Sequence, residues 1–260
     1  MTKYCITFSG DKYHDQTRRT VEDASKFGVD KVLVYDDYWL THCRPDFVEQ
    51  NKWAWQHPKT RGFGWFIWKP FIILDALNRV KDGDIVLYVD GDTYPIADLS
   101  ALYDICEKQG GIMLFAASGW PQVYWCKRDC YIIMGQDTPE YTGLQAPAGS
   151  AQFMLFQKGP AHPRQFLEEW LKYVCMEKAN TFDPSKLAPE YPVFREHRCE
   201  QAILTNLALK YHHKLWREAC AYGNDHPEDK EVYGQLFVQY GPHTYGDTRG
   251  AGSCFRNVND

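Results

Sequence analysis

Two aspartates near the middle of the chain have the type and spacing of a metal-binding pair. Asp90 and Asp92 are separated by one glycine and follow the run D-I-V-L-Y-V, residues 84–89. Carboxylates at positions i and i+2 can bind one hard divalent cation, and oxygen ligands suit Mg²⁺ or Mn²⁺. A D-x-D sequence alone is common in surface turns. Its place after a strand-like run favours a functional site, because open α/β sheets bind ligands at the carboxyl ends of their strands.

The elements that must position this pair alternate between strand and helix. Residues 3–9 and 31–35 predict strands and residues 14–27 a helix between them, which forms a β-α-β unit and implies a parallel sheet. Further along, the pattern predicts strands at residues 84–89, 112–116 and 151–156 and helices at residues 71–80, 99–109, 163–177 and 200–210. We therefore expect an α/β fold in one domain, residues 1–260, with a mostly parallel central sheet, helices on both faces and an irregular C-terminal segment.

The composition excludes several classes of protein. Hydrophobic residues make up 44% and charged residues 24%, which argues against disorder, collagen and coiled coil. The formal charge of −5 argues against a nucleic-acid partner. No apolar stretch approaches the roughly 18–20 residues that span a bilayer, and no signal-peptide pattern opens the chain. The 9 cysteines contain no C-x-x-C pair and fit a reducing compartment, so we expect a cytoplasmic protein with no membrane span.

Several motifs, in sequence order, resemble those of GT-A fold glycosyltransferases, which use nucleotide-sugar donors. The stretch G-F-G-W-F-I-W-K-P at residues 62–70 resembles the G-[YF]-G-x-x-x-W-K-P stretch of bacterial and large-virus enzymes of this kind. Y-V-D-G-D-T at residues 88–93 looks like the D-x-D motif of the fold. E-Q-A-I-L at residues 200–204 is similar to a helix start in the retaining group that includes glycogenin and bacterial lipooligosaccharide galactosyltransferases. H-T-Y-G-D-T-R at residues 243–249 is similar to that group's His-x5-Lys motif, with Arg in place of Lys.

The resemblance implies a metal-dependent transferase that moves a sugar from a nucleotide-diphosphate donor, most commonly a UDP-sugar, to a glycan or other hydroxyl acceptor. Asp90 would contact both the donor ribose and the metal, and Asp92 and His243 would complete the ligands of Mn²⁺ or Mg²⁺. Arg249 would clamp the diphosphate, a task that suits a planar guanidinium, and Lys69 is a second phosphate candidate.

The resemblance also implies a division of labour along the chain. Residues 1–116 would form the nucleotide-sugar-binding half, with Tyr13 and Asp36 where this fold receives the nucleoside. Residues 117–260 would form the acceptor-binding half and a C-terminal lid. Three aromatic residues after the predicted strand 112–116 are candidates for an acceptor platform: Trp120, Tyr124 and Trp125.

The sugar gains positive character as its bond to the diphosphate breaks, and a carboxylate or amide near its face would stabilise it. The position of Glu200 and Gln201 in the motif implies that they are the catalytic residues. The alternative for Glu200 is a carboxylate that merely favours a helix start. The motif indicates retention of the anomeric configuration. If the enzyme inverts instead, a general base is needed, and Asp137 and Glu140 are candidates.

Two other classes of function stay open at this point. A sugar nucleotidyltransferase shares a similar α/β core, although S-G-D-K at residues 9–12 is poor in the glycine that its N-terminal loop uses. A non-catalytic carbohydrate-binding protein is supported only by the aromatic content of 15%.

Overall fold

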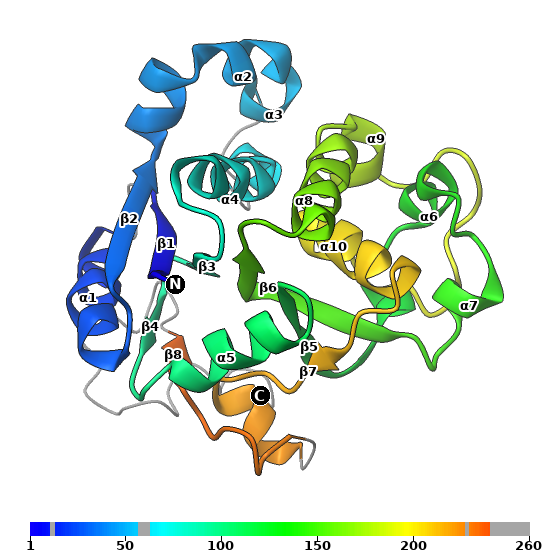
Figure 1. The fold of residues 1–260 in the computed structure, drawn as a ribbon. Coiled ribbons are helices and arrows are strands. Elements are labelled where there is room, and N and C mark those ends of the chain that lie inside the picture. Colours follow the sequence, from blue (N-terminus) through cyan, green and yellow to red (C-terminus); the bar gives the residue numbers. More distant parts are fainter. Residues whose placement is uncertain (11–13, 57–62, 227–228, 240–260) are drawn as a thin grey trace.

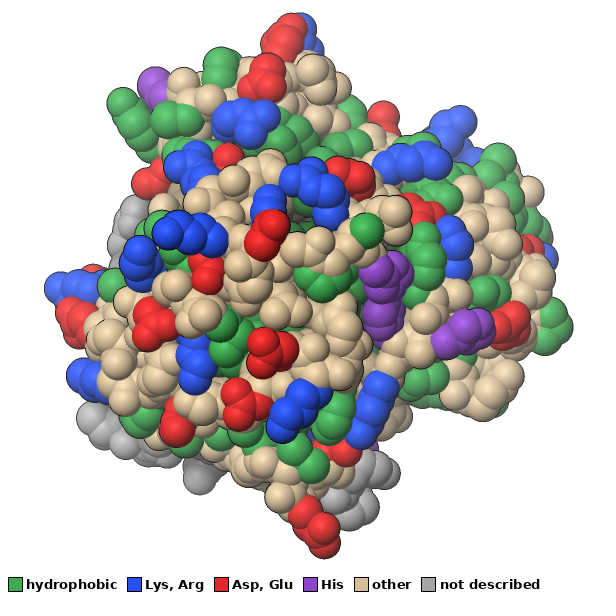
Figure 2. Space-filling view, in the orientation of Figure 1, with side chains coloured by type: hydrophobic (Ala, Val, Ile, Leu, Met, Phe, Trp, Pro, Cys, Tyr) green, Lys and Arg blue, Asp and Glu red, His purple; other side chains and the backbone are tan. Residues whose placement is uncertain are grey.

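The structure is a computed structural model that describes residues 1–10, 14–56, 63–226 and 229–239. Its strands form a six-stranded sheet and a two-stranded sheet, and helices surround them (Figure 1). None of the helices in the described part of the chain is both long enough and apolar enough to cross a membrane. On the face drawn in Figure 2, acidic and basic side chains are interspersed.

The central sheet has the strand order β2-β1-β3-β6-β5-β7. Its strands are β1 (Lys3–Ser9), β2 (Lys31–Asp36), β3 (Ile85–Val89), β5 (Ile112–Pro121), β6 (Pro147–Gln157) and β7 (Leu215–Trp216). β1 runs parallel to both β2 and β3, β5 runs parallel to β7, and β6 is antiparallel to its two neighbours. A smaller antiparallel sheet pairs β4 (Thr93–Pro95) with β8 (Phe237–Gln239).

Helices cover both faces of the central sheet. The longer ones are α1 (His14–Ala24), α4 (Trp68–Arg79), α5 (Ser100–Lys108), α8 (Ala161–Val174) and α10 (Cys199–Lys210). Shorter ones are α2 (Pro45–Gln50), α3 (Lys52–Gln56), α6 (Arg128–Met134), α7 (Pro139–Thr142) and α9 (Glu177–Asn180). The predicted α/β architecture, with a mostly parallel sheet between layers of helices, is confirmed.

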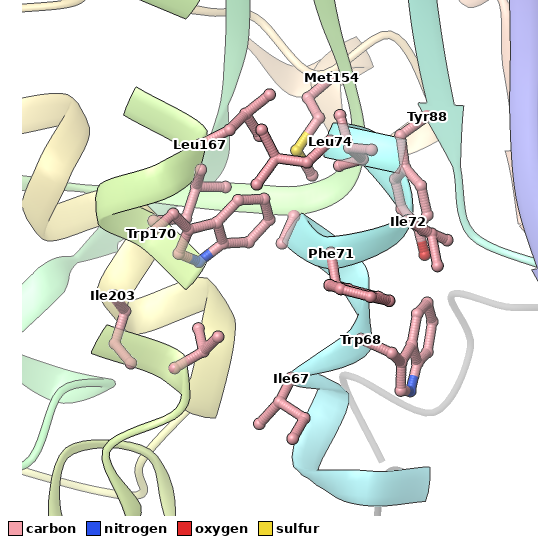
Figure 3. Packing of buried hydrophobic residues seen from close by; sticks show 14 of the residues in the cluster. Ile67, Trp68, Phe71, Ile72, Leu74, Tyr88, Met154, Leu167, Trp170 and Ile203 are labelled. Atoms are coloured by element: carbon pink, nitrogen blue, oxygen red, sulfur yellow. The ribbon is translucent and has the colours of Figure 1, made fainter. Parts of the chain in front are cut away.

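Side chains alternate along β3, which explains why a buried hydrophobic cluster lies on each face of the central sheet. Val86 and Tyr88 join a buried cluster with residues of α4, α8 and α10, whereas Ile85, Leu87 and Val89 join a cluster on the opposite face with residues of α5. Successive side chains of a strand point to opposite faces, so a strand buried on both sides is apolar throughout. Figure 3 shows the first cluster, in which Trp170 of α8 and Phe71 of α4 pack between the helices.

The register of the parallel strands decides where a ligand can bind. Ile6 pairs with Tyr88, and Ser9 pairs with Asp36. The carboxyl ends of β2, β1 and β3 therefore share one edge of the sheet, where the fold leaves room for ligands.

Candidate functional site

The turn after β3 holds the two aspartates of the D-x-D motif against strand β1. A Cβ atom at Gly91 would lie 2.5 Å from the backbone oxygen of Phe8, so the close approach of the turn requires glycine. The Thr93 backbone N–H donates to the Asp90 carbonyl oxygen at 2.9 Å and closes the turn. Asp92 accepts hydrogen bonds from Thr93 Oγ1 at 3.2 Å and from Gln239 Nε2 at 3.3 Å.

A left-handed backbone turn precedes α4 and belongs to the W-K-P stretch. Gly64, Trp65 and Phe66 have φ angles of 56°, 53° and 58°, a region that residues other than glycine rarely adopt. A Cβ atom at Gly64 would overlap the ring of Trp55. The backbone oxygen of Trp65 accepts a hydrogen bond from the Asn180 side chain at 3.0 Å, which helps to hold this conformation. The turn leaves Lys69 in the first turn of α4.

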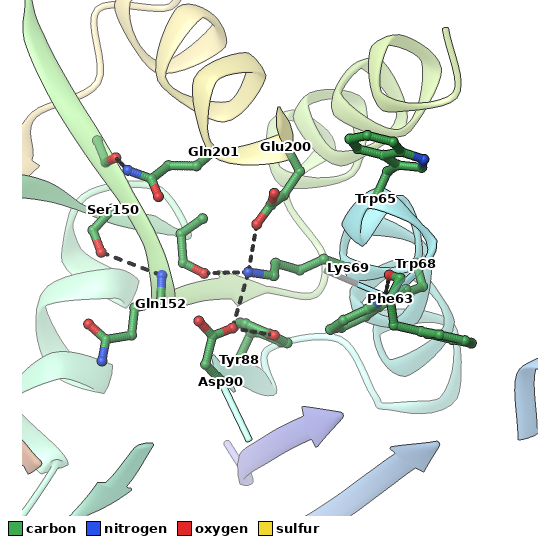
Figure 4. A network of polar contacts seen from close by, with 12 residues as sticks. Phe63, Trp65, Trp68, Lys69, Tyr88, Asp90, Ser150, Gln152, Glu200 and Gln201 are labelled. Carbon is green, nitrogen blue, oxygen red and sulfur yellow. Dashed lines mark hydrogen bonds and ion pairs between the residues drawn. The ribbon is translucent and has the colours of Figure 1, made fainter. Parts of the chain in front are cut away.

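Lys69 is the centre of a buried polar network (Figure 4). Its Nζ atom lies 3.1 Å from Asp90 Oδ1 and 2.9 Å from Glu200 Oε1, and it donates to the backbone oxygen of Ala151 at 3.0 Å. The Tyr88 hydroxyl donates to the same Asp90 oxygen at 2.6 Å. The Lys69 side chain is only 3% exposed, so these partners replace nearly all of its water.

The opposite charges in this network stabilise the charged forms of Lys69 and Glu200. Burial alone would lower the pKa of Lys69, but the charges of Asp90 and Glu200 outweigh burial and raise it. Burial raises the pKa of Glu200, and the charge of Lys69 opposes that rise. One cation thus serves two carboxylates, and the group carries a net negative charge in a site largely removed from water.

Asp92 carries the other negative charge of the D-x-D turn. Burial, and then the charge of Asp90, raises the pKa of Asp92 to about 7, against the hydrogen bonds from Gln239 and Thr93. A divalent cation between the two carboxylates would relieve this repulsion, and their oxygen ligands fit Mg²⁺ or Mn²⁺. Among the described residues, no cluster of three or more His, Cys, Asp or Glu side chains is arranged to hold a metal. The predicted third ligand, His243, lies outside the described residues.

The start of α10 is anchored to the elements around it. The backbone oxygen of Glu200 accepts a hydrogen bond from Trp170 Nε1 of α8 at 2.9 Å. Gln201 Nε2 donates to the backbone oxygen of Gly149 on β6, also at 2.9 Å. Cys199, the first residue of the helix, has a φ angle of 43° in the left-handed region. These contacts fix both predicted catalytic side chains at one point beside the sheet.

A cavity of about 650 Å³ lies beside this network. Lys69, Asp90, Glu200 and Gln201 line it together. Its aromatic lining consists of Phe66, Trp120, Trp125, Phe182 and Tyr222. A concave site with apolar walls and a few convergent polar groups is typical of small-molecule binding.

The structure thus brings four of the predicted site residues together at one cavity: Lys69, Asp90, Glu200 and Gln201. Asp36 lies at the end of β2, on the same sheet edge, but it does not line the cavity, and its Oδ1 accepts the Trp39 backbone N–H at 2.6 Å. Tyr13 and Arg249 lie outside the described residues.

The two alternative general bases lie elsewhere. Asp137 is paired with Arg128 at 3.1 Å and accepts a hydrogen bond from the Tyr191 hydroxyl at 2.6 Å. Glu140 is an exposed residue of α7. Neither of them lines the cavity, so the geometry favours Glu200.

The acceptor platform is only partly as predicted. Trp120 and Trp125 line the cavity, whereas Tyr124 does not. Trp120 belongs to β5, which continues to Pro121 rather than ending at residue 116.

Several residues in or beside the cavity were not predicted from the sequence. Tyr88 does not line the cavity but binds Asp90, and it carried a usable signal, because side chains two positions apart on a strand share a face and Asp90 follows at that spacing. Glu218 and Tyr222 come from the irregular segment after β7, where no periodic pattern marks them. His197 and Arg198 end the loop before α10 and also lacked a signal.

Neither a protein-family model nor a curated protein sequence matches the chain. Among solved structures, the similarity is to glycosyltransferases, and the chain has a glycosyltransferase fold. It is similar to the crystal structure of mouse xyloside xylosyltransferase 1 in its apo form, with a TM-score of 0.50, 11% sequence identity, and coverage of 92% of this chain and 98% of that one. It also matches the apo structure of the bifunctional glycosyltransferase WbbM, with a TM-score of 0.46, 10% identity, and coverage of 79% of this chain and 37% of that one. The first of these two structures confirms the predicted glycosyltransferase fold.

Proposed function

We propose that the protein is a metal-dependent glycosyltransferase that moves a sugar from a nucleotide-diphosphate donor, a UDP-sugar, to a hydroxyl group of a glycan or other acceptor. One observation carries this proposal: the buried Lys69 joins Asp90 of the D-x-D turn to Glu200 on the wall of the cavity. Buried charged groups that converge on a cavity are characteristic of catalytic sites. The glycosyltransferase fold makes sugar transfer the reaction that this arrangement fits best.

The donor would bind along the carboxyl edge of the sheet, in the half formed by residues 1–116. Asp90 and Asp92, with His243, would hold Mn²⁺ or Mg²⁺. When bound, the metal supplies positive charge that stabilises the departing diphosphate. Lys69 adds a fixed positive charge beside the same carboxylates.

Other residues would orient the two ends of the donor. Tyr13 and Asp36 would contact the nucleoside, since Asp36 ends the strand two positions along the sheet from β3. Arg249 would clamp the diphosphate. These roles follow from the resemblance of the motifs to those of glycosyltransferases. The same resemblance is the basis for proposing a lid within residues 117–260.

At the sugar, the bond between the anomeric carbon and the diphosphate oxygen breaks, and positive charge develops on the sugar ring. The Glu200 carboxylate, oriented by Lys69, would stabilise that charge electrostatically. Gln201 donates its amide N–H to Gly149, which leaves its side-chain carbonyl oxygen for the ligand. We propose retention of configuration, as the motif at Glu200 and Gln201 implies; neither of the alternative bases predicted from the sequence, Asp137 and Glu140, lines the cavity.

The acceptor would bind against the aromatic wall. Trp120 and Trp125 line the cavity, and their rings lie 5.4 Å apart at nearly a right angle. An indole ring offers a flat apolar surface for the C–H face of a sugar. All the described cysteines are free, which fits the cytoplasm that we propose as the compartment.

The test is a proton NMR screen of nucleotide sugars with the purified protein and Mg²⁺. The proposal predicts release of a nucleoside diphosphate from one donor, and a product sugar with the donor's anomeric configuration. An inverted product would contradict retention. Turnover of a nucleoside triphosphate with a sugar phosphate would identify a nucleotidyltransferase instead. Carbohydrate binding without cleavage of any donor would identify a non-catalytic binding protein.

A further inference from the structure

Two arginine side chains stack on the aromatic residues at the cavity, and one of them, Arg198, lines it. The guanidinium carbon of Arg198 lies 4.5 Å from the ring centroid of Trp125, and that of Arg195 lies 5.9 Å from the same ring. Arg195 also lies over Trp120 at 5.0 Å and over Tyr124 at 4.5 Å. The backbone holds this arrangement, since the N–H of Arg195 donates to the Tyr124 carbonyl oxygen at 2.9 Å.

The two arginines differ in their acidic partners. Arg198 Nε lies 2.7 Å from Glu196 Oε1, so an ion pair compensates its charge. Within the described part of the chain, no carboxylate forms an ion pair with Arg195. Arg195 is therefore a cation that three aromatic rings, rather than an acid, hold beside the cavity.

Arg195 lies beside the cavity, against two of its lining residues, Trp120 and Trp125. It is an exposed residue, whereas Trp120 beneath it is 38% exposed and lines the cavity. The guanidinium thus lies at the rim, on the side of the indole wall. The carboxylates of Asp90 and Glu200, which line the same cavity, are paired with Lys69 and not with Arg195.

We propose that the acceptor carries an anionic group, a carboxylate or a phosphate, which Arg195 binds while the acceptor's sugar ring packs against Trp120. This inference rests on the proposed function, because it assigns the substrate class of the same cavity. A guanidinium binds carboxylate and phosphate oxygens in a bidentate manner. Stacking on three rings restricts the Arg195 side chain before the ligand arrives, which lowers the entropy lost on binding.

The experiment compares matched neutral and anionic sugars. Methyl glucoside, methyl glucuronide and the 6-phosphate of methyl glucoside, with the corresponding galactosides, are titrated by saturation-transfer NMR into the protein with UDP and Mg²⁺. We expect the anionic sugars to bind about tenfold more tightly than their neutral counterparts, the effect of one charge-assisted contact. Comparing carboxylate with phosphate identifies the preferred anion. The preference should shrink as salt concentration rises.

Two variants show whether Arg195 is responsible. Arg195→Gln should reduce the preference for anionic sugars to about twofold or less. Arg195→Lys keeps the charge but not the planar guanidinium, so its preference should lie between those of Arg195→Gln and the unaltered protein. Arg44→Gln is the matched control, because Arg44 also stacks on an aromatic ring, that of Phe71 at 4.4 Å, and does not line the cavity. It should keep the full preference.

Equal affinity for neutral and anionic sugars, no binding of any anionic sugar, or an unchanged preference in Arg195→Gln would overturn the proposal. Hydrolysis of a nucleotide-sugar donor is measured separately, on the same protein preparations without any acceptor. That reaction needs no acceptor, so its presence or absence tests the proposed transferase function separately.

Discussion

Lys69 Nζ lies 2.9 Å from Glu200 Oε1 and 3.1 Å from Asp90 Oδ1. One buried cation therefore joins the start of α4, the end of β3 and the start of α10. Removing Lys69 would leave the buried Glu200 and the partly exposed Asp90 without their shared cation, so we expect both stability and activity to depend on it.

The first prediction concerns Lys69. Lys69→Met should lower the free energy of unfolding by about 3–5 kcal/mol, because it leaves two carboxylates without their shared cation. It should also abolish donor hydrolysis. Urea denaturation followed by tryptophan fluorescence measures the first effect, and nucleotide release measures the second.

A double variant separates the charge effect from loss of packing. Lys69→Met combined with Glu200→Gln removes one of the uncompensated charges, so it should be more stable than Lys69→Met alone. A double variant that is less stable than the single one would contradict this view of the network.

The second prediction concerns Glu200. Glu200→Gln should lower the transfer rate about 10²–10⁴-fold, the range for a positioned catalytic group. Asp137→Asn should change the rate only a few-fold, and Glu140→Gln should change it less, because neither side chain lines the cavity. Steady-state kinetics with one donor compares all three. A larger loss in Asp137→Asn than in Glu200→Gln would move the assignment away from Glu200.

The third prediction concerns the D-x-D turn. Asp92→Ala should abolish metal-dependent binding of the donor while the chain stays folded, since the hydrogen bonds of Asp92 come from the side chains of Thr93 and Gln239. Calorimetric titration of UDP with and without Mn²⁺ measures this, and circular dichroism checks the fold. Asp98→Asn is the control, because Asp98 Oδ1 instead accepts the Ser100 backbone N–H at 2.9 Å before α5. Full activity of Asp92→Ala, or of the unaltered protein in excess chelator, would count against a metal.

The fourth prediction concerns the pH dependence of stability. His197 is 2% exposed, and burial, followed by the charge of Lys127, lowers its pKa to about 3 from the usual 6.5. The folded protein keeps this ring neutral, whereas the unfolded chain takes up a proton below pH 6.5. The contribution of the neutral His197 to the free energy of unfolding is therefore fully present above pH 6.5 and is lost as the pH falls toward 3.

His197→Asn keeps an acceptor for the Lys127 backbone N–H, which His197 Nδ1 accepts at 3.2 Å, but it does not titrate. Between pH 7 and pH 5, the unaltered protein should lose about 2 kcal/mol more stability than this variant. The exposed His42, changed to Asn, should leave the pH profile unaltered. Parallel pH profiles for His197→Asn and the unaltered protein would contradict the assignment.

Most of the fold can be predicted from the sequence, because its signals are local. The predicted strand at residues 3–9 is β1, and the apolar run 84–89 contains β3. The direction of β6 was not predicted, since a strand pattern shows burial and not the direction of pairing. The short helices within residues 45–56 also escaped prediction, because each is too short to show a helical period.

The site was predictable only where a motif marked it. The motifs indicated Lys69, Asp90 and Glu200, but not that one ammonium group contacts both carboxylates, which depends on packing between distant elements. Arg195 lies in a loop with no periodic pattern. Its importance becomes visible only when that loop lies against Trp120 and Trp125.

We propose that the cavity beside Lys69, Asp90 and Glu200 binds and cleaves a nucleotide sugar. The most direct measurement is a crystal structure with Mn²⁺ and a non-hydrolysable analogue of the donor found by the NMR screen. We expect the diphosphate beside Asp90 and Asp92, and the anomeric carbon facing Glu200 and Gln201. A nucleotide bound away from this cavity, or bound here with no metal at the two aspartates, would contradict it.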